Sequence, residues 1–186
     1  MLSKITMAVF GIFVSLSLLI VSSALAKGPN GPAGQSNKAH LYLYEKDSSW
    51  NIVNGGAWGK MTYNQSGSTF DYVFNGHELQ PNTGYSLIYY ADPWPGDNPG
   101  ALIVSGTSNG GGNIHLAGSV DLTIDLPSLP DQNAVDPCEG GASPCPGAKI
   151  WLVPSSDYDA TTNSMTAWNP ENYLFENNSI LYEDTP

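Results

Sequence analysis

The sequence contains no arginine, so six lysines are its only permanently cationic side chains, against 17 acidic residues and a formal net charge of −11. Such a chain offers no cluster of cations able to neutralise phosphates, which argues against nucleic acid as a partner. Two cysteines are too few for a disulfide-dense scaffold or a four-cysteine zinc site. Beyond residue 26 no stretch keeps a helical apolar period, which argues against long amphipathic helices.

The first 26 residues have the features of an export signal. Lys4 precedes an apolar run at residues 5–20, and the SALA sequence at 23–26 places small residues where a signal peptidase recognises them. The alternative is an uncleaved membrane anchor, for which the 17 residues at 5–21 are short. We therefore predict a secreted or cell-surface protein that contacts a membrane only through this signal peptide, during export.

Short alternating segments dominate the chain beyond a Gly/Pro-rich lead-in at residues 27–38. In the HLYLY sequence at 40–44, side chains alternate between two faces, and turn residues follow at 47–49. Alternation bounded by Gly, Pro, Asn or Asp recurs along the chain and predicts strands. The expected strands cover residues 40–44, 50–53, 59–64, 69–75, 85–90, 102–106, 113–120 and 150–153, followed by a terminal hairpin of 173–176 with 179–182.

Two further stretches complete the predicted organisation. Residues 121–148 carry five prolines without alternation and are predicted to form a long loop. Within residues 165–174, Asn169 as N-cap and Pro170 at the first helical position favour one helical turn. Roughly nine short strands predict one all-β domain at residues 39–186, an antiparallel, Greek-key-like β-sandwich with at most one short helix near the C-terminus.

Residues 79–87, with the sequence LQPNTGYSL, resemble the turn-then-tyrosine stretch of immunoglobulin-like and fibronectin type III sandwiches. In those domains a buried corner tyrosine bonds through its hydroxyl to nearby backbone and fixes a crossover between the sheets. The resemblance implies that Tyr85 is the corner residue and that Leu79 caps the core. The Cys…Trp…Cys spacing of antibody domains is absent.

More broadly, the chain resembles a family of secreted prokaryotic β-sandwich proteins of unassigned activity. The resemblance implies a single-domain secreted β protein and carries over no catalytic residues. It rests on six blocks, GAWGK at 56–60, FDYVFNGHEL at 70–79, LIYYADPWPG at 87–96, GGNIHLAGSV at 111–120, GAKIWLV at 147–153 and WNPENYLFE at 168–176.

Cys138 and Cys145 bracket six residues within the Pro/Gly-rich loop. Because an exported protein meets an oxidising environment, we expect these cysteines to form a local disulfide. A metal–thiolate site is the alternative, for which only Glu139 is close enough in sequence to be a third ligand.

A second loop carries oxygen donors at alternate positions, the spacing that a calcium loop uses. Its candidate ligands are Asp157, Asp159, Thr161 and Asn163. The loop departs from the EF-hand pattern, because Thr162 stands in place of the invariant glycine and Trp168 in place of the bidentate glutamate. Solvated turns explain the same residues, so calcium is one interpretation and no cofactor is required.

Three histidines, His40, His77 and His115, are the number that a catalytic zinc or a copper site uses. No pair has the spacing of an HxH or HExxH motif, so local sequence does not assemble them. They leave a metal-dependent enzyme as one alternative function.

Aromatic residues in loops are the most suggestive candidate ligand contacts. Trp94 and Trp168 lie beside prolines, and Tyr89 and Tyr90 are close to Trp94 in sequence. If exposed, these rings would stack on sugars; otherwise they fold back as lids over the ends of the sandwich. We therefore predict a non-catalytic binding module whose partner is a glycan or a surface protein. A structural or assembly protein that pairs exposed strand edges is a further alternative.

Overall fold

The computed structural model describes residues 36–90, 100–127, 135–136 and 145–185. The predicted signal peptide, residues 27–35 of the lead-in, Trp94 and Cys138 lie outside these described residues. Over the described part of the chain, no helix combines the length and the apolar character needed to cross a membrane.

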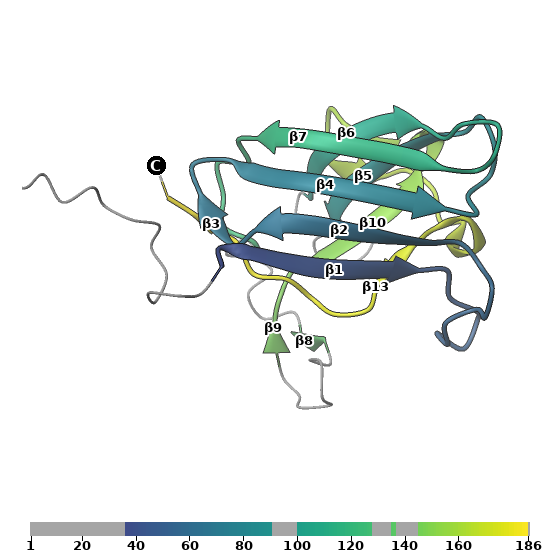
Figure 1. The fold of residues 1–186 in the computed structure, drawn as a ribbon, viewed down its shortest axis with the longest axis horizontal. Coiled ribbons are helices and arrows are strands. Elements are labelled where there is room, and N and C mark those ends of the chain that lie inside the picture. Colours follow the sequence, from purple (N-terminus) through teal and green to yellow (C-terminus); the bar gives the residue numbers. More distant parts are fainter. Residues whose placement is uncertain (1–35, 91–99, 128–134, 137–144, 186) are drawn as a thin grey trace, which may run out of the picture.

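Two packed sheets form the fold, and this confirms the predicted all-β sandwich. In Figure 1 the larger sheet lies in front of the smaller one, so we call them the front sheet and the back sheet. All neighbouring strands within both sheets are antiparallel. The front sheet has the order β13 (Phe175–Glu176), β1 (Lys38–Tyr44), β2 (Trp58–Asn64), β4 (Phe70–His77) and β7 (Ile114–Val120). The back sheet has the order β10 (Lys149–Pro154), β5 (Gly84–Tyr90) and β6 (Ala101–Thr107).

The chain crosses between the sheets in a Greek-key-like manner. After β4 it forms the β5–β6 hairpin in the back sheet and then returns to place β7 beside β4. The strands in the front sheet form because their apolar residues recur every second position. In β4, for example, Phe70, Tyr72 and Phe74 are buried while Asp71 and Val73 are exposed.

The core lies between the two sheets. Inward residues of the front sheet, such as Leu41 and Phe74, pack against Tyr85, Leu87 and Leu152 of the back sheet. Close packing here requires a glycine at position 59, because a Cβ at that position would collide with the Phe74 ring.

The back sheet is covered on its outer side as well. Ile88 of β5 and Trp151 of β10 pack there against Tyr158, Met165 and Tyr173, which come from the segment that follows β10. This segment contains short elements that cross the outside of the back sheet. They are η2 (Ser155–Asp157), β11 (Tyr158–Asp159), β12 (Ser164–Met165) and η3 (Pro170–Asn172). The exposed sheet face in the described structure is therefore the outer side of the front sheet.

Three short strand pairs lie outside the two main sheets. β11 pairs with β12, and β3 (Ser66–Gly67) pairs in parallel with β14 (Glu183–Asp184). Within the predicted long loop, β8 (Val135–Asp136) pairs with β9 (Cys145–Pro146). The sequence pattern did not predict these two-residue strands, because so short a segment carries no alternation.

The terminal hairpin predicted for residues 173–176 and 179–182 is wrong. Phe175 pairs with Tyr44 on β1, whereas Ile180 bridges Ala148 and Tyr182 bridges Leu126. The predicted strand at 50–53 is also wrong, because Ile52 makes a single bridge to Lys46. Its first residue, Trp50, has a φ of 64°, which no strand residue adopts.

The helical turn near the C-terminus is present as η3, which begins at Pro170. Asn169 precedes it, but its side chain does not cap the turn. The Asn169 amide instead donates a hydrogen bond of 2.9 Å to the Asp157 carboxylate.

Candidate functional site

The outward side chains of β1, β2, β4 and β7 form one continuous surface, because the register of these strands aligns them in rows. We call this surface the outer face. Three rows make up most of it, Tyr44 with Trp58 and His77, then Tyr42 with Lys60, Asn75 and His115, and then His40 with Thr62, Val73 and Ala117. Lys38, Asp71 and Ser119 lie beyond the third row.

Aromatic rings gather at the end of the outer face where β1 ends and β2 begins. The Trp58 indole stacks on the His77 imidazole with ring centroids 4.6 Å apart, and Tyr42 and Tyr44 stack at 6.2 Å. Trp58 is 37% exposed and Tyr42 39%. Because neighbouring strands lie about 4.8 Å apart, the row from Tyr44 through Trp58 to His77 extends over roughly 10 Å.

Cross-strand hydrogen bonds fix the polar side chains around these rings. His77 Nδ1 lies 3.0 Å from Asn113 Oδ1, and His115 Nδ1 lies 2.8 Å from Asn75 Oδ1. His40 Nδ1 lies 3.0 Å from Thr62 Oγ1. Since an amide oxygen only accepts, Nδ1 donates in the first two bonds. The outer face thus combines aromatic surface with oriented hydrogen-bonding groups.

Lys60 lies at the centre of the outer face, between Tyr42 on one neighbouring strand and Asn75 on the other. Its ammonium lies 5.6 Å from the centroid of the Tyr42 ring, within the range of a cation–π contact.

The three histidines do not form a metal site. All three lie on the outer face, but β2 separates His40 on β1 from His77 on β4, and His115 is one strand further on. Within the described ranges no group of three His, Cys, Asp or Glu side chains is arranged to hold a metal ion. The physical reason is the order and register of the strands, which place the three imidazoles on different strands of the sheet and so keep them from converging on one point.

The loop aromatics behave differently from the prediction. Tyr89 is completely buried in the core, and Tyr90 is buried with its ring stacked on Trp151 at 3.8 Å. Neither presents a surface to a ligand, because both belong to β5, which is covered on both sides. Trp168 is 41% exposed but packs against Trp151 and Tyr173, so it acts partly as a lid over the back sheet.

The predicted calcium ligands are directed apart. The buried carboxylate of Asp157 accepts hydrogen bonds from Tyr173 Oη at 2.7 Å and from Ser156 Oγ at 2.9 Å, besides that from Asn169. Burial alone would raise the pKa of Asp157, but these hydrogen bonds outweigh it and hold the pKa below its ordinary value.

The other candidate calcium ligands serve the β11–β12 turn. Asp159 faces outward and accepts hydrogen bonds from the Thr161 N–H and the Thr162 hydroxyl. Asn163 adopts a positive φ of 51° and accepts a hydrogen bond from Tyr158 Oη. These contacts correspond to the solvated-turn interpretation, and the structure does not bring the four residues together.

Tyr85 lies where the chain crosses from the front to the back sheet. It is 1% exposed, and its hydroxyl accepts a hydrogen bond of 3.2 Å from the Gln80 N–H. Burial raises the pKa of Tyr85. Leu79 is buried in the same core.

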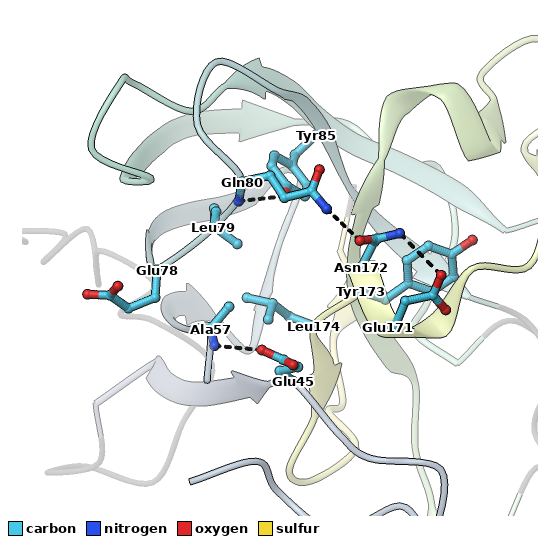
Figure 2. Close-up of a pocket in the computed structure, with 10 residues that line it drawn as sticks. All are labelled: Glu45, Ala57, Glu78, Leu79, Gln80, Tyr85, Glu171, Asn172, Tyr173 and Leu174. Carbon is cyan, nitrogen blue, oxygen red and sulfur yellow. Dashed lines mark hydrogen bonds between the residues drawn. The ribbon is translucent and has the colours of Figure 1, made fainter. Parts of the chain in front are cut away.

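A cavity of about 70 Å³ lies beside Tyr85, at the end of the sandwich. Three glutamates line it, but Figure 2 shows Glu78 directed away from Glu45 and Glu171. The Glu45 carboxylate accepts a hydrogen bond of 2.9 Å from the Ala57 N–H. A space of this size holds only a few water molecules, so the outer face is the stronger candidate site.

Comparison of the chain with protein-family models, with curated proteins and with solved structures found no match. The resemblances to immunoglobulin-like domains and to secreted prokaryotic proteins therefore stay predictions. The same holds for the disulfide, since Cys138 lies outside the described residues.

Sequence reasoning missed Trp58 and Lys60 as candidate site residues. Alternation in residues 40–44 already placed His40, Tyr42 and Tyr44 on one face. The pattern of aromatic and polar residues at even spacing in residues 58–62 was the remaining signal. The sequence does not show that the residues at 40–44 and those at 58–62 lie side by side. Only the order of the strands in the sheet shows it.

Proposed function

We propose that this protein is a secreted or cell-surface, non-catalytic module that binds a glycan on the outer face. The observation that carries the proposal is the row Tyr44, Trp58 and His77, three rings on neighbouring strands beside side chains already oriented by cross-strand hydrogen bonds. Groups held in place before binding cost less entropy when a ligand arrives.

The chemistry of the outer face fits a sugar better than a protein partner. The core of a protein interface is apolar, with few charged side chains. The three rows instead contain only two aliphatic residues, Val73 and Ala117, and the charged Lys60 lies at their centre. A sugar ring presents apolar C–H groups, which pack on aromatic rings, and hydroxyls, which pair with amide, hydroxyl and imidazole groups.

Affinity electrophoresis of the full-length chain through gels that contain soluble polysaccharides tests the proposal. We expect at least one polysaccharide to retard the protein, and Trp58→Ala to weaken binding about tenfold, the effect of losing roughly 1.4 kcal/mol of contact energy. Tyr42→Ala should act in the same direction. Thermal unfolding of each variant checks that the fold is intact.

Trp168→Ala is the matched control, because Trp168 is exposed to a similar extent but lies over the back sheet. The proposal requires that this variant keep full binding. If Trp168→Ala abolishes binding while Trp58→Ala leaves it unchanged, the ligand lies on the loop aromatics instead. If no polysaccharide is bound and Trp58→Ala abolishes self-association in sedimentation, the outer face is an assembly interface.

A further inference from the structure

We infer that the ligand of the outer face is an anionic glycan, a polysaccharide chain that carries carboxylate or sulfate groups. This inference rests on the proposed function and adds the charge of the ligand. It arises from the distribution of charge over β1, β2, β4 and β7, which carry little of the negative charge of the whole chain.

The whole chain is strongly acidic, yet the outward positions of β1, β2, β4 and β7 are not. They hold two of the six lysines, Lys38 and Lys60, together with all three histidines. Of the 17 acidic residues, only Asp71 occupies such a position. The outer face is therefore a patch of low negative charge that would repel an anion least.

Asp71 does not neutralise Lys60. Its carboxylate already accepts hydrogen bonds from Ser119 Oγ at 2.6 Å and from Thr69 Oγ1 at 3.0 Å. Lys60 lies opposite Asn75, four residues further along β4. At about 3.3 Å per residue, the two side chains are roughly 13 Å apart along the strand, beyond the range of an ion pair.

The Lys60 ammonium has no ion-pair partner among the residues that the structure describes, and its contact there is the Tyr42 ring. An ammonium carries three hydrogen-bond donors and no acceptor, so it leaves donors available to an anionic oxygen. Because Tyr42 and Asn75 flank it on the two neighbouring strands, a charged group bound to Lys60 would also bring its sugar ring against aromatic surface.

The acidic residues at the aromatic end of the sheet limit the shape of the ligand. Glu45 follows β1, and Glu78 follows β4 with its side chain at the surface. A membrane or a nucleic acid duplex is wide enough to meet the exposed Glu78 carboxylate as well, and this charge would repel it. A single polysaccharide chain is narrow enough to contact the outer face alone.

The test measures binding of the full-length chain, by isothermal titration at low salt, to polygalacturonate and to the same polymer after chemical reduction of its carboxylates. A sulfated galactan forms a third arm that separates carboxylate from sulfate recognition. We expect an anionic polymer to bind about tenfold more tightly than the reduced polymer, the effect of one charge-assisted contact. Salt should weaken the anionic complex and leave the neutral one unchanged.

Variants assign the effect to Lys60. Lys60→Gln should remove the preference for the anionic polymer without weakening binding of the reduced polymer, and Lys60→Arg should retain the preference. Lys149→Gln, which changes the net charge equally but lies on β10 of the back sheet, is the control and should retain it. Thermal unfolding of each variant excludes loss of the fold as the cause.

The outcomes separate this inference from the proposed function. Equal binding of the anionic and reduced polymers, with Lys60→Gln changing neither, would overturn the charge preference and leave the glycan module standing. No binding of any polymer would overturn both. Binding to vesicles of anionic lipid that exceeds binding to polygalacturonate, and that Lys60→Gln abolishes, would assign the outer face to membranes and also contradict the inference.

Discussion

The indole of Trp58 stacks on the imidazole of His77 across the β2–β4 pair, with the ring planes 29° apart. The next residue, Gly59, faces the opposite side of the sheet and makes room there for the buried ring of Phe74. The exposed aromatic surface thus depends on Trp58, and the tight core packing depends on Gly59, the next residue of the same strand. A substitution of Trp58 should therefore affect binding, whereas a substitution of Gly59 should affect stability.

Gly59→Ala should destabilise the fold by about 1–3 kcal/mol, the usual cost of overpacking a close-packed core. The added methyl group would collide with the Phe74 ring, which is completely buried in a close-packed core. Urea unfolding measures the change. Gly84→Ala on β5 is the control, because its Cβ would meet only ordinary contacts with Ser155, and a comparable loss in both variants would contradict this explanation.

Asp157→Asn should lower the free energy of unfolding at neutral pH by about 1–3 kcal/mol, because it replaces a buried carboxylate by a neutral amide and so weakens the hydrogen bonds that the carboxylate accepts. The pKa of Asp157 is lowered in the folded protein, so its contribution is fully present above the unfolded value near 3.8 and is lost as pH falls through the folded value. The difference between the two proteins should therefore shrink in strongly acidic solution.

Urea titrations of both proteins at neutral pH and below pH 3.8 measure this difference. Glu183→Gln provides a control at an exposed carboxylate and should change the stability at neutral pH little. A difference between wild type and Asp157→Asn that stays constant down to the lowest pH would contradict the account.

Tyr85→Phe should cost about 0.5–1.5 kcal/mol of stability, because the Gln80 N–H loses its hydrogen-bond acceptor in a buried corner. Chemical denaturation gives the value. Tyr42→Phe is the comparison, since the Tyr42 ring is exposed on the outer face, and it should be close to neutral. If the two variants are equally stable, the hydroxyl of Tyr85 has no role in fixing the crossover.

Much of the fold could be predicted from local pattern, because one residue in two faces the core in the front sheet. β1, β2, β4 and β7 each lie within a few residues of their predicted ranges. Pairing between distant segments has no such local signal, which is why the terminal hairpin prediction failed. Asn177-Asn178 has the composition of a turn, but Phe175 pairs with Tyr44 and so extends the front sheet.

The candidate site was less predictable for two physical reasons. Tyr89 and Tyr90 are buried because β5 is covered on both sides. In such a strand apolar residues face both ways, so the sequence lacks the alternation that separates buried from exposed side chains. Trp58 and His77 become neighbours only through the order and register of β2 and β4. Sequence identified the aromatic residues of the chain but not which of them share a surface.

The location of a bound glycan tests the central proposal most directly. Chemical-shift changes on titration with a short, soluble oligosaccharide of a polymer that the protein binds would map the contact residue by residue. We expect the largest changes on the outward residues of β1, β2 and β4, above all Tyr42, Trp58 and His77. Changes that centre instead on Trp168 and Trp151, with the outer face unaffected, would contradict the proposal.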